Sequence, residues 1–221
     1  MAGSIILLNG CSSAGKTTLA LAIQDASPRP IQYIALDHFR DGMPGKYRGM
    51  NSLPGEPGAR GLNIIPRDGR TELRFGDVGL AVLRGMRRAI AAFAISGVDV
   101  VVDDLLLERA FLLDYLDALA GLDVVFVGVR CDLDTVNRRE SSRPGRFPGT
   151  AAAHYLRVHQ DCEYDVEVDT AACSPREGAR RVIAVRQALP RPTAFDRLRI
   201  GLSPRMEHPP KGTQRPSTDV P

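Results

Sequence analysis

A nine-residue segment near the N-terminus has the residue types and the spacing of a phosphate-binding loop. It matches G-x-x-x-x-G-K-[ST] and consists of Gly10, Cys11, Ser12, Ser13, Ala14, Gly15, Lys16, Thr17 and Thr18. Glycines in such a loop let the backbone curl so that several N–H groups point inward, toward the bound phosphates. The segment therefore predicts a nucleoside triphosphate site, in which Lys16 reaches the β- and γ-phosphates and the Thr17 hydroxyl holds Mg²⁺.

The residues on either side of this loop support the same interpretation. Residues 4–9 form a short apolar run typical of a buried strand, and residues 17–26 are rich in good helix formers. A helix that starts at the loop adds unpaired N–H groups and a partial positive charge at the phosphates. The alternative is a chance glycine-rich turn, which these flanks make the poorer interpretation.

Three aspartates follow predicted strands and could complete the site. Asp37 comes directly after the apolar run 31–36, and Asp103 and Asp104 end the β-branched run 98–104. Ligands of open α/β sheets bind at the carboxyl ends of the strands, so these side chains are expected beside the loop. A carboxylate there can bind Mg²⁺ through water. Neighbouring strand residues point to opposite faces, so either Asp103 or Asp104 could serve, and two solvated acids are the alternative.

A cluster of arginines follows the next predicted strand. Its members are Arg130, Arg138, Arg139, Arg143 and Arg146. The planar guanidinium group binds phosphate oxygens in pairs and stabilises the charge on a transferring phosphoryl group. A charge cluster is usually a solvated face, but beside a phosphate loop we expect residues 132–150 to form an arginine lid.

The order of the elements predicts an α/β fold. Short apolar runs at residues 4–9, 31–36, 98–104, 123–129 and 164–168 alternate with amphipathic segments, among them 75–96, 108–120, 147–161 and 174–189. Such alternation is typical of a parallel sheet with helices on both faces, here a sheet of five strands.

Two segments lack helical or strand periodicity. Residues 41–77 are rich in glycine and proline, and we expect a structureless connection that caps the acceptor substrate, with a tolerated insertion as the alternative. Residues 190–221 are rich in proline and predict a flexible tail. Residues 1–189 are then the folded domain.

Composition excludes few classes of protein. The net charge of the 221 residues is +3 and no lysine-rich block occurs, so charge gives no indication of nucleic acid. Four cysteines without a CxxC pair are expected to be reduced thiols of a cytoplasmic protein. The longest apolar stretch, residues 89–107, is interrupted by acids, so no membrane span is predicted, and residues 5–8 are expected to be a strand and not a signal peptide. The sequence does not predict an oligomeric state.

Several stretches together resemble the chloramphenicol phosphotransferase family of small P-loop kinases. The resemblance spans residues 4 to about 188 and rests on the runs Ile5–Gly10, Ser12–Lys16, Asp37-x-Phe39, Val101–Asp104, Val127–Asp132, Arg139-Glu140-x-x-Arg143-x-x-Arg146 and Val158–Thr170. It implies ATP-dependent phosphorylation of a hydroxyl on a small molecule, an antibiotic in that family. It also implies that Asp37 is the catalytic base and that Arg139, Arg143 and Arg146 close on the phosphates. Residues 41–74 are unlike the family's acceptor region, which leaves the acceptor open.

Two other functions fit the same residues. A housekeeping P-loop kinase of a nucleotide, sugar acid or cofactor precursor would use nearly the same groups, and only the 41–74 segment could distinguish it. A nucleotide-binding regulatory module is the second alternative, although the sequence has no guanine-specifying N-K-x-D motif.

Overall fold

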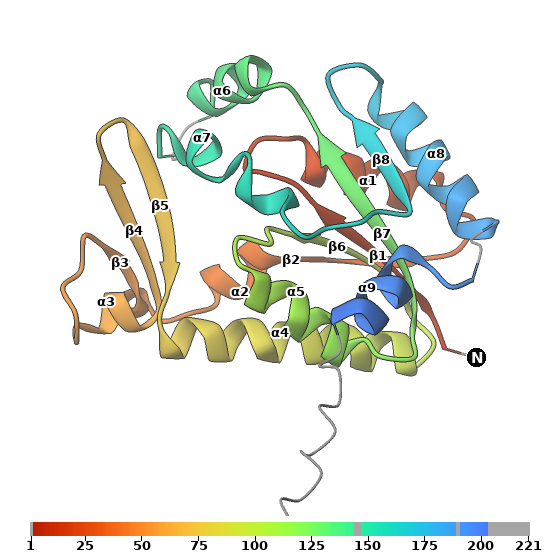
Figure 1. The fold of residues 1–221 in the computed structure, drawn as a ribbon, viewed down its shortest axis with the longest axis horizontal. Helices are drawn as coiled ribbons and strands as arrows, with labels where there is room; N and C mark the ends of the chain where they lie inside the picture. Colours follow the sequence, from red (N-terminus) through yellow and green to blue (C-terminus); the bar gives the residue numbers. More distant parts are fainter. Residues whose placement is uncertain (1, 144–146, 189–190, 203–221) are drawn as a thin grey trace, which may run out of the picture.

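The chain folds around a five-stranded parallel sheet, as the alternation of strands and helices predicts. The computed structural model describes residues 2–143, 147–188 and 191–202. The strand order is β2-β6-β1-β7-β8 (Figure 1). The strands are β1 (Ser4–Asn9), β2 (Ile31–Ala35), β6 (Asp99–Asp104), β7 (Asp123–Arg130) and β8 (Val166–Asp169). The side chains of residues 5–8 in central β1 are completely or almost completely buried, because a parallel sheet covered on both faces needs continuous apolar strands.

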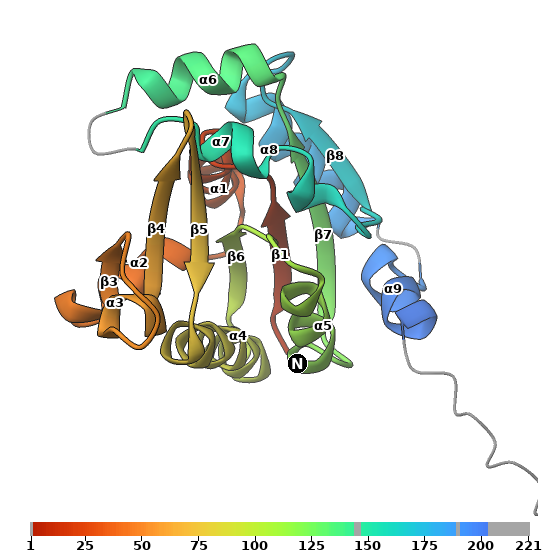
Figure 2. The same ribbon diagram turned by 60° about the vertical axis from the view of Figure 1, so that its left-hand side comes forward.

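Helices cover both faces of this sheet. On one face α1 (Lys16–Ala26) packs against α8 (Pro175–Gln187). The other face carries α4 (Asp77–Ile95), α5 (Arg109–Ala118) and α9 (Ala194–Leu202) (Figure 2). This arrangement leaves the carboxyl ends of the strands open for a site.

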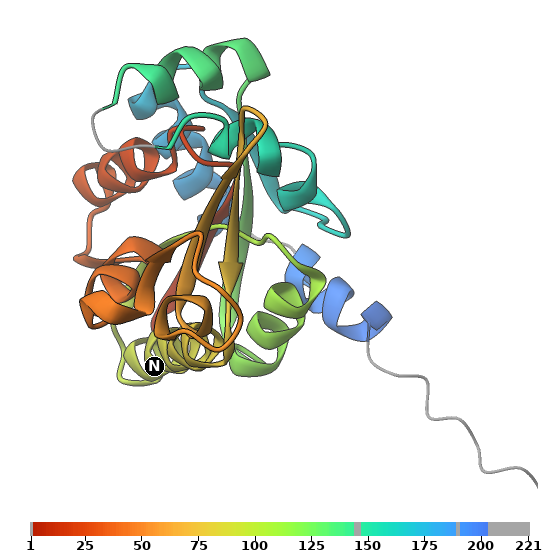
Figure 3. The ribbon, with the colours of Figure 1, turned by 90° about the vertical axis from the view of Figure 1, so that its left-hand side faces the viewer.

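Residues 41–77 are not structureless, and that prediction is wrong. The segment forms η1 (Gly45–Tyr47), β3 (Arg48–Met50), α3 (Pro57–Arg60), β4 (Leu62–Arg67) and β5 (Arg70–Phe75), with a second sheet of order β3-β4-β5. The β4–β5 hairpin turns at Asp68 and Gly69, whose φ angles are 50° and 73°. Two successive left-handed residues suit the twist of a tight hairpin, and Asp-Gly is a favoured pair there. This small sheet, called the cap below, lies to one side of the main sheet in Figure 1 and faces the viewer in Figure 3.

The connection after β7 contains shorter helices than the sequence predicts. It comprises α6 (Leu133–Ser141), α7 (Thr150–His154) and η2 (Arg157–His159), so the single helix expected over residues 147–161 is wrong. The break lets the Val158 carbonyl accept a hydrogen bond from Asn9 Nδ2 at 2.5 Å, which ties this connection to the end of β1.

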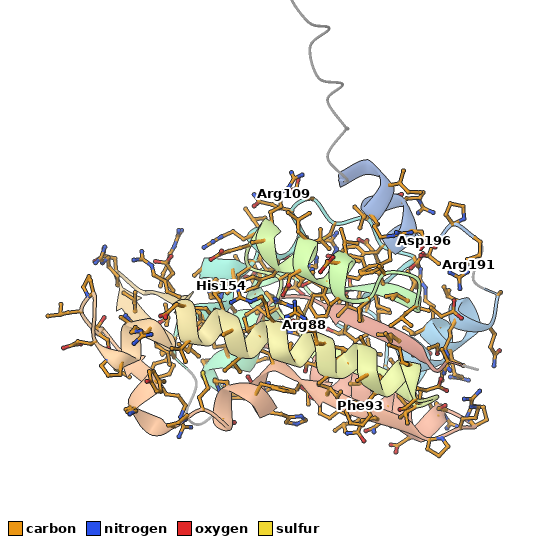
Figure 4. All side chains as sticks on the ribbon, turned by 90° about the horizontal axis from the view of Figure 1, so that it is seen from below. Arg88, Phe93, Arg109, His154, Arg191 and Asp196 are labelled. Carbon is orange, nitrogen blue, oxygen red and sulfur yellow. The ribbon has the colours of Figure 1, made fainter. Side chains whose placement is uncertain are left out.

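The predicted flexible tail differs from the structure over residues 191–202. Helix α9 covers Ala194–Leu202, and the Phe195 side chain is 3% exposed. The Ala194 amide donates to Asp165 at 2.6 Å, and Arg191 lies against Asp196 (Figure 4). Residues 203–221 lie outside the described part of the chain. Within the described part, no helix is both long enough and apolar enough to cross a membrane, and all four cysteine thiols are free.

Candidate active site

The phosphate-binding loop connects β1 to α1, as predicted. Ser13 and Gly15 have φ angles of 61° and 94°, and this left-handed backbone curls the loop around the start of α1. Gly10 passes so close to β7 that an added Cβ would lie 2.5 Å from the Val129 carbonyl oxygen, so only glycine fits. Ser13 Oγ is buried and has no hydrogen-bond partner among the described residues. An unpartnered hydroxyl inside a ring of backbone amides fits an anionic ligand.

Lys16 is the first residue of α1 and lies within the loop. Its Nζ donates to the carbonyl oxygens of Gly10 and Cys11 at 2.9 and 3.0 Å, and lies 3.6 Å from Asp103 Oδ1. The ammonium group is therefore held directly above the loop by neutral carbonyls and one carboxylate.

Thr17, Asp103 and Tyr33 meet at the edge between β6 and α1. Thr17 Oγ1 donates to Asp103 Oδ2 at 2.7 Å, and the Tyr33 hydroxyl donates to the same oxygen at 3.3 Å. Burial, together with the negative charge of Asp103, raises the pKa of Tyr33 to about 12, so the phenol remains a donor. Tyr33, in the middle of a predicted strand, was not among the residues predicted for the site.

Asp104 has a different environment from Asp103. Its carboxylate accepts hydrogen bonds from the Tyr115 hydroxyl at 2.7 Å and the Leu105 amide at 2.6 Å, and lies 3.9 Å from the buried Arg87. The side chain is completely buried, and this burial raises its pKa although Arg87 opposes the shift. Of the two acids left open by the sequence, only Asp103 contacts Thr17 and Lys16.

Asp37 lies at the same sheet edge, in the first turn of α2 (Leu36–Asp41). Arg40 Nη1 donates to Asp37 Oδ1 at 2.8 Å, while Nε and Nη2 of the same guanidinium donate to the two oxygens of Asp41 at 2.9 and 3.0 Å. The Asp37 carboxylate is thus held by a side chain that is itself fixed, a contact that the sequence analysis did not anticipate.

One cavity of about 650 Å³ joins these groups. Lys16, Thr17 and Asp103 line it together with Asp37 and Arg40. The cap forms a wall of the same cavity through Gly45, Arg48, Leu62, Ile64 and Leu73. The volume is within the range of pockets that hold drug-sized ligands.

The predicted arginines differ in their contacts. Arg130 pairs with Glu167 at 2.7 Å and Arg138 contacts Thr135 at 2.6 Å, both on the surface. Arg139 donates to the Thr170 hydroxyl and carbonyl at 3.0 and 2.9 Å. Arg143 lines the large cavity, and Arg146 lies outside the described residues.

Gly15 and Arg143 also line a smaller cavity of about 190 Å³. Its other lining residues include Thr18, Arg139 and Pro175.

The strand order, the loop and the edge position of the site define the P-loop nucleotide-binding fold of kinases. Solved structures with this fold are similar to the chain. Mycobacterium tuberculosis APS kinase has a TM-score of 0.60 and 16% identity, and the match covers 84% of this chain and 98% of that one. A Sinorhizobium meliloti gluconokinase has a TM-score of 0.54 and 21% identity, and the match covers 91% of this chain and 95% of that one. The Deinococcus radiodurans tunicamycin resistance protein has a TM-score of 0.56 and 16% identity, and the match covers 82% of this chain and 94% of that one.

The sequence itself matches one family over nearly the whole folded region. The pattern described as chloramphenicol phosphotransferase-like protein matches residues 3–187, and the chain belongs to this family. A relative from *M. tuberculosis*, named as a candidate O-phosphotransferase, is 35% identical over 207 residues, covering 89% of this chain and 88% of its own. The chain is thus a phosphotransferase of the kinase type, as the resemblance implied.

Proposed function

We propose that the chain transfers the γ-phosphoryl group of ATP to a hydroxyl of a small molecule bound between the loop and the cap. The observation that carries the proposal is the shared cavity, which is lined by Lys16 and Asp103 as well as by Asp37. The family description makes an antibiotic alcohol, chloramphenicol first, the reference acceptor.

Each group has a role in this reaction. The amides of residues 10–18, together with Lys16, hold the phosphates, and the second cavity takes the base. Thr17 and Asp103 would hold Mg²⁺, directly or through water, and the ion would neutralise charge on the phosphates. Their 2.7 Å contact brings a hydroxyl and a carboxylate together, a donor set that suits this ion. Arg143 would bind the transferred group, and Arg139 and Arg146 are proposed to complete the lid.

Asp37 is the proposed general base. The acceptor oxygen forms a bond to the γ-phosphorus, the bond from that phosphorus to the bridging oxygen of ADP breaks, and the acceptor proton passes to Asp37. The proton needs to leave only late in a loose transition state, so a carboxylate is basic enough. The Arg40 contact at 2.8 Å fixes the direction of the carboxylate toward the cavity.

Asp37→Asn is the direct test. The variant should bind ATP as the wild type does but lose turnover by about 100-fold or more, because general bases contribute about that much. Asp25→Asn, at an exposed position of α1, is the matched control. Phosphorylated acceptor is measured by mass spectrometry and ATP binding by calorimetry. Near-normal turnover in Asp37→Asn would overturn the assignment.

A further inference from the structure

The face of the cap sheet that lines the cavity carries three aliphatic side chains and one arginine. Arg48 of β3 is the register partner of Leu62 in β4, and Ile64 of β4 is the partner of Leu73 in β5. All four residues line the large cavity. Directly opposed residues of neighbouring strands lie on the same face, so the acceptor meets an apolar strip with a guanidinium at one end.

The two arginines of the acceptor region differ in how their charge is used. Arg40 donates three hydrogen bonds to the carboxylates of Asp37 and Asp41, so those N–H groups are already used within the protein. Asp41 gives both of its oxygens to Arg40. Arg48 has only a 3.8 Å ion-pair contact with Asp41 and forms no side-chain hydrogen bond to any residue that the structure describes. Its side chain is 44% exposed, so its donors are accessible from the cavity.

Resting on the proposed function, we infer that the acceptor is an alcohol with an apolar body and an anionic group, and that Arg48 selects it by binding that group. The body packs on Leu62, Ile64 and Leu73, while the hydroxyl lies at Asp37. A guanidinium with unused donors binds a carboxylate or phosphate through paired hydrogen bonds, whereas an uncharged acceptor leaves those donors in water. Chloramphenicol carries no such group and is expected to be a poorer acceptor than an acid of similar size.

The experiment compares an acid acceptor with its uncharged ester, and both with chloramphenicol and a mixture of natural metabolites. Wild-type protein is incubated with γ-labelled ATP and either 3-phenyllactate, its methyl ester, chloramphenicol or a small-metabolite extract, and labelled products are identified by mass spectrometry. Labelled products formed from acceptors that already carry an anionic group are the expected result. Labelled products formed only from uncharged acceptors, such as the ester or chloramphenicol, would overturn the inference and leave the proposed function standing. No labelled product in any arm would contradict the proposed function itself.

The role of Arg48 is then tested on the best acid acceptor and its methyl ester. Arg48→Met should lower kcat/KM for the acid by about 10- to 100-fold, the range for losing a hydrogen bond between charged groups. The same variant should leave kcat/KM for the ester unchanged, and Arg48→Lys should retain part of the preference. Arg67→Met is the matched control, because Arg67 is an exposed arginine of β4 outside this cavity. Equal losses for acid and ester, or no loss for either, would contradict the assignment of Arg48.

Discussion

The Thr17 hydroxyl donates a 2.7 Å hydrogen bond to Asp103, a residue 86 positions further along the chain. Parallel pairing of β1 with β6 brings the start of α1 to the end of β6 and so makes this contact. The adjacent Asp104 instead lies with Tyr115 and Arg87 in the core. Two neighbouring carboxylates are therefore expected to have separate roles, one in metal binding and one in stability.

Asp103→Asn should weaken the binding of the Mg²⁺ that turnover requires. If Asp103 holds the ion through water, its loss should raise the Mg²⁺ concentration for half-maximal rate by about 10- to 100-fold, as for other groups that support a metal site. Initial rates measured across a range of Mg²⁺ concentrations check this outcome. An unchanged half-maximal concentration would mean that Asp103 is not part of the metal site.

Asp104→Asn is the complementary prediction. The substitution removes the negative charge 3.9 Å from the buried Arg87 and one acceptor from the buried group around Tyr115, while Arg87 keeps its 2.6 Å salt bridge with Asp114. The free energy of unfolding should therefore fall by about 1–3 kcal/mol. Urea unfolding measures this loss. The Mg²⁺ dependence of the remaining folded enzyme should be unchanged, and a shift comparable to that of Asp103→Asn would contradict the division of roles.

Glu140 is predicted to position the lid. Its buried carboxylate accepts hydrogen bonds from the Gly149 amide at 2.8 Å and the Ala151 amide at 2.9 Å, so it fixes the return of the chain after Arg143. The Thr71 hydroxyl of the cap donates to the Pro148 carbonyl at 2.8 Å and joins the cap to the same turn. Glu140→Ala removes both acceptors from the two amides and should loosen the segment that carries Arg143.

The expected result of Glu140→Ala is a rise in KM for ATP of about 10-fold, because one or two charge-assisted hydrogen bonds no longer hold the lid in place. Glu140→Gln keeps one carbonyl oxygen and should recover part of this loss. Ser141→Ala, on the exposed side of the same helix, is the control. Initial rates against ATP concentration provide the measurement. A lower melting temperature with an unchanged KM would show that Glu140 serves folding alone.

The parts of the site that the sequence predicted depend on local patterns. The loop over Gly10–Thr18 and the acids at strand ends follow from a motif and from the rule that ligands bind at one sheet edge. The choice between Asp103 and Asp104, and the contact from Arg40 to Asp37, depend on side-chain direction. Tyr33 also remained hidden, because its role comes from a strand pairing between β2 and β6 that no local pattern contains.

The cap shows a different reason for failure. The many glycines and prolines of residues 41–77 led to the prediction of a structureless connection. The same residues contain a pattern typical of a β-hairpin, an Asp68-Gly69 turn between runs of alternating apolar residues. In the arginine cluster, five similar side chains have different partners, with Arg130 paired to Glu167 and Arg138 in contact with Thr135 on the surface, while the lid itself stays a prediction. A run of arginines in the sequence predicts that these side chains will pair with acceptor groups, but only the tertiary fold determines which groups they pair with.

His154 is predicted to make the folded state sensitive to acid. The side chain is completely buried, and neither ring nitrogen has a hydrogen-bond partner among the described residues. Burial, assisted by Arg157, lowers the pKa of His154 from 6.5 to about 4. As the pH falls, His154 becomes protonated in the unfolded chain before it does in the folded one, so the free energy of unfolding should fall by about 1.4 kcal/mol per pH unit from about pH 6.5 down to the folded pKa.

His154→Leu removes the contribution of this proton to the free energy of unfolding. The variant should therefore be more stable than the wild type by about 1–2 kcal/mol near pH 5, with a smaller difference near pH 7.5. Urea unfolding at both pH values checks the prediction, and a difference that does not grow as the pH falls would contradict it.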